Sequence, residues 1–337
     1  MKKVLKKGVY FFLVFLIAIL SIALLIFLIK SPEKQLPTEQ NKKIILGFSQ
    51  IGSESAWRTR NTQSIFEAAE ENNIQIIFDD AQQKQENQLK AIRSFIVYQV
   101  DIIAFVPIVE DGWDNVLQEA KDAGIPVIIV DRQINADESM YAGFLGEDGF
   151  TEGKRAAEFL VKKFNTKSDQ VNIVEFSGTL NSSVVTNRAK GFRSVIENNA
   201  KYQIVLSEDG DFLRSRGKEI MDRILDENRG LFLNGKRIDV IYSHNDSMTL
   251  GLLDSLANHS YTQFPVIISI DAEQKSIDAL KAGKLSCVVE CNPNLGPTLM
   301  QLVIATHEGR AIPRVTYMEE SVFTENDDFS SIAPRGY

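Results

Sequence analysis

The stretch GFSQIGSESAWR, residues 47–58, joins the end of one predicted strand to a polar loop and the start of a helix. The apolar residues 44–46 before it are typical of the strand, and Trp57 and Arg58 fall in the first turn of the helix. An aromatic ring, a guanidinium and several hydroxyl and carboxylate groups are therefore expected at the carboxyl end of a strand. Open α/β sheets bind small ligands at such places.

Short apolar runs alternate with amphipathic stretches from this point to the end of the chain. The predicted strands are 44–49, 74–79, 102–106, 127–130, 171–176, 204–207, 240–243, 266–270 and 287–289. The predicted helices are 56–72, 85–98, 115–123, 152–164, 184–198, 215–227, 247–257 and 274–282. Strands that are apolar on both faces are typical of parallel sheets covered by helices on both sides. The pattern predicts an α/β fold with doubly wound parallel sheets.

Several of these strands run directly into polar or charged residues. These residues are Asp131 with Arg132, then Asn245, Asp271 and Glu290. Taken singly, Asn245 and Asp271 are also good candidates for helix N-caps. Because the carboxyl ends of parallel strands share one edge of a sheet, the set together with Trp57 and Arg58 indicates a ring of groups around a ligand. Flat aromatic faces beside charged hydrogen-bonding groups suit a sugar, which has an apolar face and a rim of hydroxyls.

The sequence carries no motif that is typical of catalysis, nucleotide binding or metal binding. No G-x-G-x-x-G follows a strand, and no G-x-S-x-G is present. Residues 149–155 resemble a phosphate-binding loop only superficially, since the two glycines are one residue too close and no Ser or Thr follows Lys154. The histidines have no metal-ligand spacing. We therefore expect no enzyme activity, no cofactor and no metal.

The net charge of the chain disfavours one class of partner. The formal net charge is −8, and the first thirty residues hold five lysines and no acid, so the remainder is more acidic still. Nucleic-acid binding needs basic patches, and the composition disfavours it.

The two cysteines are too far apart to form a disulfide. Cys287 and Cys291 lie about 13 Å apart if the chain between them is extended, at ~3.3 Å per residue. A disulfide needs Cα atoms within ~7 Å, so we expect two buried, unpaired thiols.

Residues 1–30 predict a membrane segment. Lys2, Lys3, Lys6 and Lys7 precede an apolar run from Gly8 to Ile29. That run meets the ~20 apolar residues that a spanning helix needs, and the lysines place the N-terminus in the cytoplasm. A cleaved signal peptide is the alternative, with residues 21–23 as the small-residue site. Residues 31–43 are polar, contain two prolines and predict a linker. The expected location is the cell membrane, with the remaining chain on the extracytoplasmic side.

The chain resembles the periplasmic sugar-binding proteins of the ribose/galactose class, and within that class most nearly the galactofuranose-binding proteins of sugar ABC transporters. The stretches that carry the resemblance are 47–58, 82–88, 101–113, 119–127, 131–132, 191–192, 210–212, 243–246 and 293–297. It covers residues 42–337, and the most specific stretches are QQKQENQ at 82–88 and SESAWR at 53–58.

The resemblance implies two α/β lobes joined by three crossing segments, with sugar in the cleft between them and no catalysis. It places residues 42–145 and 292–325 in the first lobe, and residues 146–291 and 326–337 in the second. The implied sugar contacts are Ser53, Glu54, Trp57, Arg58, Asp131, Arg132, Arg188, Phe212, Asn245, Asp271 and Glu290.

Two hypotheses about function follow from the resemblance and the predicted anchor. In the first, the protein delivers a monosaccharide, in particular galactofuranose, to the permease of an ABC importer. In the second, it is a membrane-anchored sugar sensor that signals to a histidine kinase. A transcription regulator is disfavoured, because apolar residues flanked by lysines occupy the place of a helix-turn-helix. An enzyme is disfavoured for want of a catalytic group.

Overall fold

The computed structural model describes residue 10 and residues 12–22, 43–167 and 169–337. The chain forms two compact units, Met1–Lys42 and Lys43–Tyr337. In the first unit, the described residues are helical and their side chains are exposed. None of the helices in the described part of the chain is long and apolar enough to cross a membrane. The predicted anchor and linker lie largely outside the described residues, so both stay predictions.

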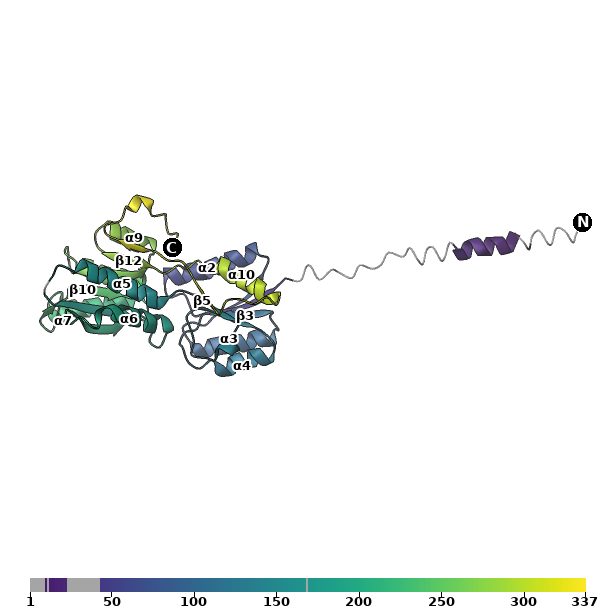
Figure 1. The fold of residues 1–337 in the computed structure, drawn as a ribbon, viewed down its shortest axis with the longest axis horizontal. Helices are drawn as coiled ribbons and strands as arrows, with labels where there is room; N and C mark the ends of the chain where they lie inside the picture. Colours follow the sequence, from purple (N-terminus) through teal and green to yellow (C-terminus); the bar gives the residue numbers. More distant parts are fainter. Residues whose placement is uncertain (1–9, 11, 23–42, 168) are drawn as a thin grey trace, which may run out of the picture. The chain divides into compact units, whose positions relative to one another are not determined.

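The second unit contains two sheets of six strands each (Figure 1). The first sheet has the order β13-β5-β4-β3-β1-β2, and all its pairings are parallel. Its strands are β1 (Ile45–Gln50), β2 (Gln75–Asp80), β3 (Ile102–Phe105), β4 (Val127–Asp131), β5 (Gly143–Gly146) and β13 (Val315–Tyr317). Its helices are α2 (Ala56–Glu71), α3 (Gln85–Val97), α4 (Asp114–Asp122) and α10 (Gly296–His307). α2 and α10 cover one face, and α3 and α4 cover the other. We call this half the first lobe.

The second sheet has the order β14-β12-β11-β10-β6-β7, and only its β12–β14 pair is antiparallel. Its strands are β6 (Val171–Ser177), β7 (Tyr202–Asp209), β10 (Val240–Ser243), β11 (Val266–Asp271), β12 (Cys287–Glu290) and β14 (Val322–Thr324). Its helices are α5 (Gly149–Lys163), α6 (Ser183–Ile196), α7 (Arg214–Asn228), α8 (Asp246–Asn258) and α9 (Gln274–Lys281). α5 and α6 pack on one face, and α7, α8 and α9 on the other. We call this half the second lobe.

The chain passes between the lobes three times. The first crossing joins β5 to α5, the second joins β12 to α10, and the third joins β13 to β14. The third crossing corrects one predicted boundary. Residues up to 325 were expected in the first lobe, but residues 322–324 pair with β12 of the second sheet. The chain therefore crosses between Tyr317 and Val322.

The α/β prediction is confirmed, and each predicted strand and helix is present with ends shifted by at most three residues. Four elements that bear on the site were not predicted: β5, α10, β13 and β14. A small hairpin of β8 (Phe232–Leu233) and β9 (Lys236–Arg237) and the short 3₁₀ helices η2 (Glu138–Met140) and η3 (Phe329–Ser331) complete the described structure. Cys287 and Cys291 are both buried and unpaired, as expected.

Candidate functional site

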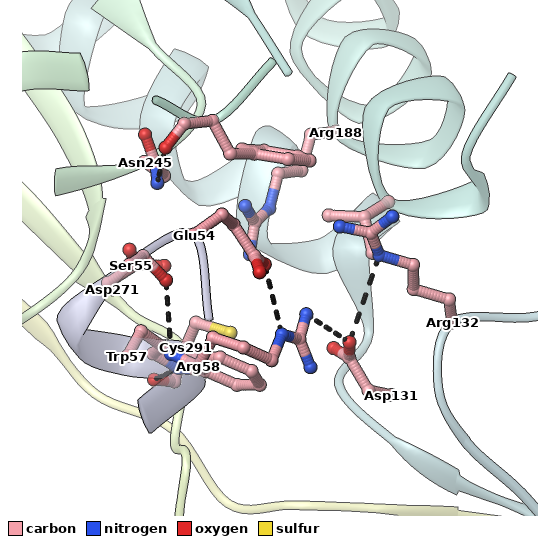
Figure 2. Close-up of a pocket in the computed structure, with 12 residues that line it drawn as sticks. Glu54, Ser55, Trp57, Arg58, Asp131, Arg132, Arg188, Asn245, Asp271 and Cys291 are labelled. Atoms are coloured by element: carbon pink, nitrogen blue, oxygen red, sulfur yellow. Dashed lines mark hydrogen bonds and ion pairs between the residues drawn. The ribbon is translucent and has the colours of Figure 1, made fainter. Parts of the chain in front are cut away.

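A pocket of about 330 Å³ lies between the two lobes, at the carboxyl ends of their strands. Both lobes and one of the crossings contribute to its lining. The first lobe contributes Glu54, Ser55, Trp57, Arg58, Asp131 and Arg132, the second lobe contributes Val184, Arg188, Phe212, Asn245 and Asp271, and the second crossing contributes Cys291. Most of these side chains are charged or polar, and Figure 2 shows them converging from several elements.

The first turn of α2 presents Trp57 and Arg58 to the pocket. Ser55 is the N-cap, and its hydroxyl accepts a hydrogen bond from the backbone N–H of Arg58 at 3.0 Å. Such a cap stabilises a helix by about 1 kcal/mol and starts it at a defined residue. The indole N–H of Trp57 donates to the carbonyl of Cys291 at 2.7 Å. The tryptophan is therefore held against the second crossing.

Four charged side chains of the first lobe form a buried chain along one wall of the pocket (Figure 2). Arg58 Nε donates to Glu54 at 3.0 Å, and Arg58 Nη2 lies 2.7 Å from Asp131 Oδ2. Arg132 Nε lies 3.8 Å from the same oxygen, and Arg132 Nη1 donates to the carbonyl of Ile108 at 3.1 Å. Arg58 Nη1 and Arg132 Nε are buried and have no hydrogen-bond partner among the described residues. Both are donors available to a ligand.

The two guanidiniums differ in electrostatic environment. Burial alone would lower the pKa of Arg58, but Asp131 and Glu54 outweigh it, and the net pKa is raised. Burial and the neighbouring charge of Arg58 lower the pKa of Arg132 to about 10. Both side chains stay protonated at neutral pH. The wall thus presents two cations that share one carboxylate, Asp131, between them.

Asp131 is held in an unusual backbone conformation at the end of β4. Its φ is +63°, in the left-handed region that non-glycine residues rarely adopt. The backbone of Asp131 lies so close to Gly146 of β5 that a Cβ on that glycine would be 2.9 Å from the carbonyl oxygen of Asp131. Holding a non-glycine residue in the left-handed region costs about 1–3 kcal/mol, and residues in this conformation are commonly found at functional sites. Here it turns the chain out of the sheet and brings both Asp131 and Arg132 to the pocket.

The second lobe supplies Arg188 through a close contact of two helices. A Cβ on Gly153 of α5 would lie 2.0 Å from the carbonyl oxygen of Arg188, so only glycine permits α5 and α6 to approach this closely. The contact sets Glu152 of α5 against Arg188 of α6, with distances of 2.6 and 3.2 Å from Nε and Nη2. A third nitrogen of Arg188 donates to the carbonyl of His244. Arg188 is therefore fixed on the pocket wall by a bidentate ion pair.

Phe212 adds a second aromatic ring to the pocket lining. Its φ is +60°, and its ring occupies the space where a side chain on Gly178 would stand, with a Cβ 2.0 Å from the ring. The guanidinium of Arg132 lies 5.4 Å from the centre of this ring. Asn245 holds the loop by donating to the carbonyl of Phe212 at 3.2 Å. Its side-chain oxygen also caps α8 by accepting from Met248 N at 3.0 Å.

Asp271 completes the second-lobe wall at the end of β11. Its carboxylate accepts a hydrogen bond from the backbone N–H of Asp246 at 3.2 Å. Burial and the neighbouring carboxylate of Asp246 raise the pKa of Asp271 well above its usual range. A protonated Asp271 can donate a hydrogen bond as well as accept one.

Nine of the eleven predicted site residues line this pocket. Ser53 and Glu290 do not line it. Ser53 is exposed, because the chain is still in the loop before the helix cap at Ser55. Glu290 forms an ion pair with Arg335 and accepts from Ser321 N at 2.9 Å, so its carboxylate ties the C-terminal segment and the third crossing together. The pocket also contains three residues that were not predicted, Ser55, Val184 and Cys291.

The chain also matches a known family along most of its length. Residues 46–311 match the model of the periplasmic binding protein domain. The chain belongs to the periplasmic binding protein family. As a member of that family it is a binding protein and not an enzyme, and the resemblance found in the sequence is confirmed.

The chain is similar to three proteins that are described with a furanose sugar. The chain is 38% identical to the galactofuranose-binding protein YtfQ of Escherichia coli over 83% of this chain and 87% of that one. It is 40% identical to a protein from Mycobacterium smegmatis solved in complex with β-D-fucofuranose, with a TM-score of 0.79 over 84% of this chain and 91% of that one. It is 36% identical to the binding component of an arabinose ABC transporter from Shewanella sp. ANA-3, solved with α- and β-L-arabinofuranose, with a TM-score of 0.77 over 83% and 92%.

Proposed function

We propose that this protein is the extracytoplasmic sugar-binding component of an ABC importer, and that its ligand is a furanose of the galactofuranose type. The observation that carries the proposal is the pocket between the lobes, where buried guanidiniums and carboxylates converge and two guanidinium N–H groups lack a partner among the described residues. Groups of this kind would be costly to leave unsatisfied, at about 1–3 kcal/mol each. A ligand with several hydroxyls satisfies them.

The chemistry of the pocket suits sugar hydroxyls. A carboxylate such as Asp131 accepts from two vicinal hydroxyls, while a guanidinium donates in a fixed fork. The rings of Trp57 and Phe212 offer apolar faces to the carbon skeleton. Because the lining comes from both lobes, the proposed ligand binds each lobe at once and excludes competing water when the lobes close.

The choice of a furanose rests on what the three relatives share. Galactofuranose, fucofuranose and L-arabinofuranose are named with these relatives. The three sugars have the same configuration around the five-membered ring and differ only in the exocyclic chain. We infer that this chain selects the same ring. The importer role is favoured over the sensor role because the Shewanella relative is a component of an ABC transporter.

A bound sugar should stabilise the protein against heat. A ligand that binds only the folded state contributes about 2.7 kcal/mol at a hundredfold excess over its dissociation constant. We expect D-galactose, D-fucose or L-arabinose to raise the melting temperature of the purified chain in a thermal-shift assay, and sucrose at the same concentration to leave it unchanged. A broad panel of monosaccharides with no such shift would contradict sugar binding.

The predicted anchor has its own test, which is independent of the sugar. If residues 1–30 form an uncleaved anchor, the full-length protein should fractionate with membranes and keep its N-terminal lysines, as read by mass spectrometry of the intact chain. Recovery of a soluble exported form that begins just after residues 21–23 would identify the segment as a signal peptide instead.

A further inference from the structure

The three crossings between the lobes bring together a group of acidic and thiol side chains next to the proposed sugar site. Of these, Cys291 also lines the sugar pocket, and Glu152 holds Arg188 in place there. Glu147 lies on the first crossing, Cys291 on the second and Glu320 on the third, while Glu152 stands in the first turn of α5. We call these four residues the hinge cluster. Glu152 and Cys291 are almost completely buried, and Glu320 is partly buried.

Three of the four side chains of the cluster have donor atoms close enough to share one ion. One carboxylate oxygen of Glu152, one of Glu320 and the sulfur of Cys291 all lie within 4.8 Å of one another. Arg188 neutralises the carboxylate of Glu152, and Arg155 approaches the third crossing by donating to the carbonyl of Glu320 at 3.3 Å. The charges of Arg188 and Arg155 also act on Glu320, but neither Glu320 nor Glu147 forms an ion pair with a described side chain.

Glu147 supplies a second and independent observation. It is 8% exposed, and neither of its carboxylate oxygens has a hydrogen-bond partner in the described part of the chain. The charge that acts most strongly on it is that of Asp131 in the sugar pocket, followed by those of Glu320 and Glu152, and Glu147 in turn acts on the thiol of Cys291. A buried carboxylate without partners costs several kcal/mol unless a proton or a cation neutralises it.

We propose that the hinge cluster is a binding site for a thiophilic divalent ion of the Zn²⁺ class, with Cys291, Glu152 and Glu320 as ligands and the charge of Glu147 nearby. Zinc takes four ligands, commonly from Cys, His and carboxylate side chains, and this set offers one sulfur and two carboxylates, which leaves the fourth position to water or to Glu147. The thiol disfavours Ca²⁺ and Mg²⁺, which prefer oxygen ligands alone. An ion at this place would tie the three crossings to one another.

The cluster offers matched variants for testing the ion. Purified, untagged full-length protein is titrated with ZnCl₂ in a buffer without chelators, and bound zinc is measured by equilibrium dialysis. We expect one zinc ion per chain. Glu320→Gln should weaken binding by at least about 100-fold, whereas Glu319→Gln, a change at the exposed neighbour, should leave it unchanged. If Glu320→Gln does not fold by circular dichroism, Glu147→Gln takes its place.

A spectroscopic readout tests the thiol ligand separately. Cobalt(II) in place of zinc should give the charge-transfer absorption of a cobalt–thiolate bond. The band should persist in Cys287→Ala, which removes the other buried thiol, and disappear in Cys291→Ser. The proposal is overturned if wild-type protein binds no zinc, if Glu320→Gln binds it as tightly as wild type, or if cobalt binds without the thiolate band. None of these outcomes depends on sugar binding, so the proposed function can fail or hold independently.

Discussion

Replacing Asp131 by asparagine should abolish detectable sugar binding while the protein still folds. Asp131 is the carboxylate that Arg58 and Arg132 share, and the three side chains are between 3 and 5% exposed. Without its charge, two buried guanidiniums face each other and the ring hydroxyls lose a charged acceptor. A hydrogen bond to a charged group is worth about 1.5–3 kcal/mol, so we expect at least a tenfold loss of affinity from that bond alone. The rearranged arginines should extend the loss beyond detection by isothermal titration calorimetry.

The asparagine variant removes the negative charge of residue 131 and keeps its backbone conformation. Asparagine tolerates the left-handed conformation that Asp131 adopts better than alanine does, so the turn after β4 should survive. Losing one partner of a buried ion pair destabilises a protein by about 3–5 kcal/mol, and thermal unfolding should report a lower melting temperature. Asp122→Asn, at an exposed position in the same lobe, is the control and should bind sugar normally. Unchanged affinity in Asp131→Asn would remove the end of β4 from the site.

The sequence predicted the sheet architecture because the strands are buried on both faces. β3, β4 and β10 are buried along their whole length and mostly apolar, and their helices follow with regular spacing. The strand ends predicted the site for the same reason, since polar residues that follow a buried strand must leave the sheet at its carboxyl edge. Asp131, Asn245 and Asp271 were found in this way. Arg188, Phe212 and Glu54 came from the family resemblance and not from local pattern.

The elements that the sequence did not predict have weak local signals. β5 is four residues long and both its ends are glycine, which is depleted in strands. α10 is so apolar around its circumference that helical periodicity is hard to see in it. β13 and β14 are three residues each, and only their pairing partners define them. The third crossing lies between them, which is why its position could not be predicted.

The differences between the predicted and the observed pocket lining have local and long-range causes. Ser53 and Ser55 stand two residues apart in one polar loop, and only the cap geometry of α2 decides which of them reaches the pocket. Glu290 ends a buried strand as Asp271 does, but Arg335 from the C-terminal segment takes its carboxylate. Cys291 reaches the pocket because the chain turns into the second crossing at that residue. The position of Glu290 depends on a residue distant in the sequence, and the other two outcomes depend on local backbone geometry that the residue pattern does not show.

The preference for ring form is expected to be the most discriminating property of the pocket. A hexofuranose carries an exocyclic glycol that the matching pyranose lacks in that form, and Glu54 and Arg58 are the charged groups of the loop that could hold it. Losing at least one hydrogen bond to a charged group should cost a pyranose about 1.5–3 kcal/mol, or roughly 10- to 150-fold in affinity. Glu54→Gln should reduce this preference, because it weakens the acceptor and releases the Arg58 side chain.

Isothermal titration calorimetry with equilibrated D-galactose tests directly which ring form of the sugar binds. The furanose is a minor form in water, so if only that form binds and the rings interconvert slowly during an injection, saturation should require a large molar excess of total sugar. L-arabinose is the matched comparison, because its furanose has the same ring but a shorter exocyclic chain. Equivalence at one galactose per chain, or a crystal with a pyranose against Trp57 and Asp131, would defeat the furanose preference. Sugar binding between the lobes would then stand on the ligand-induced rise in melting temperature and on the Asp131→Asn variant.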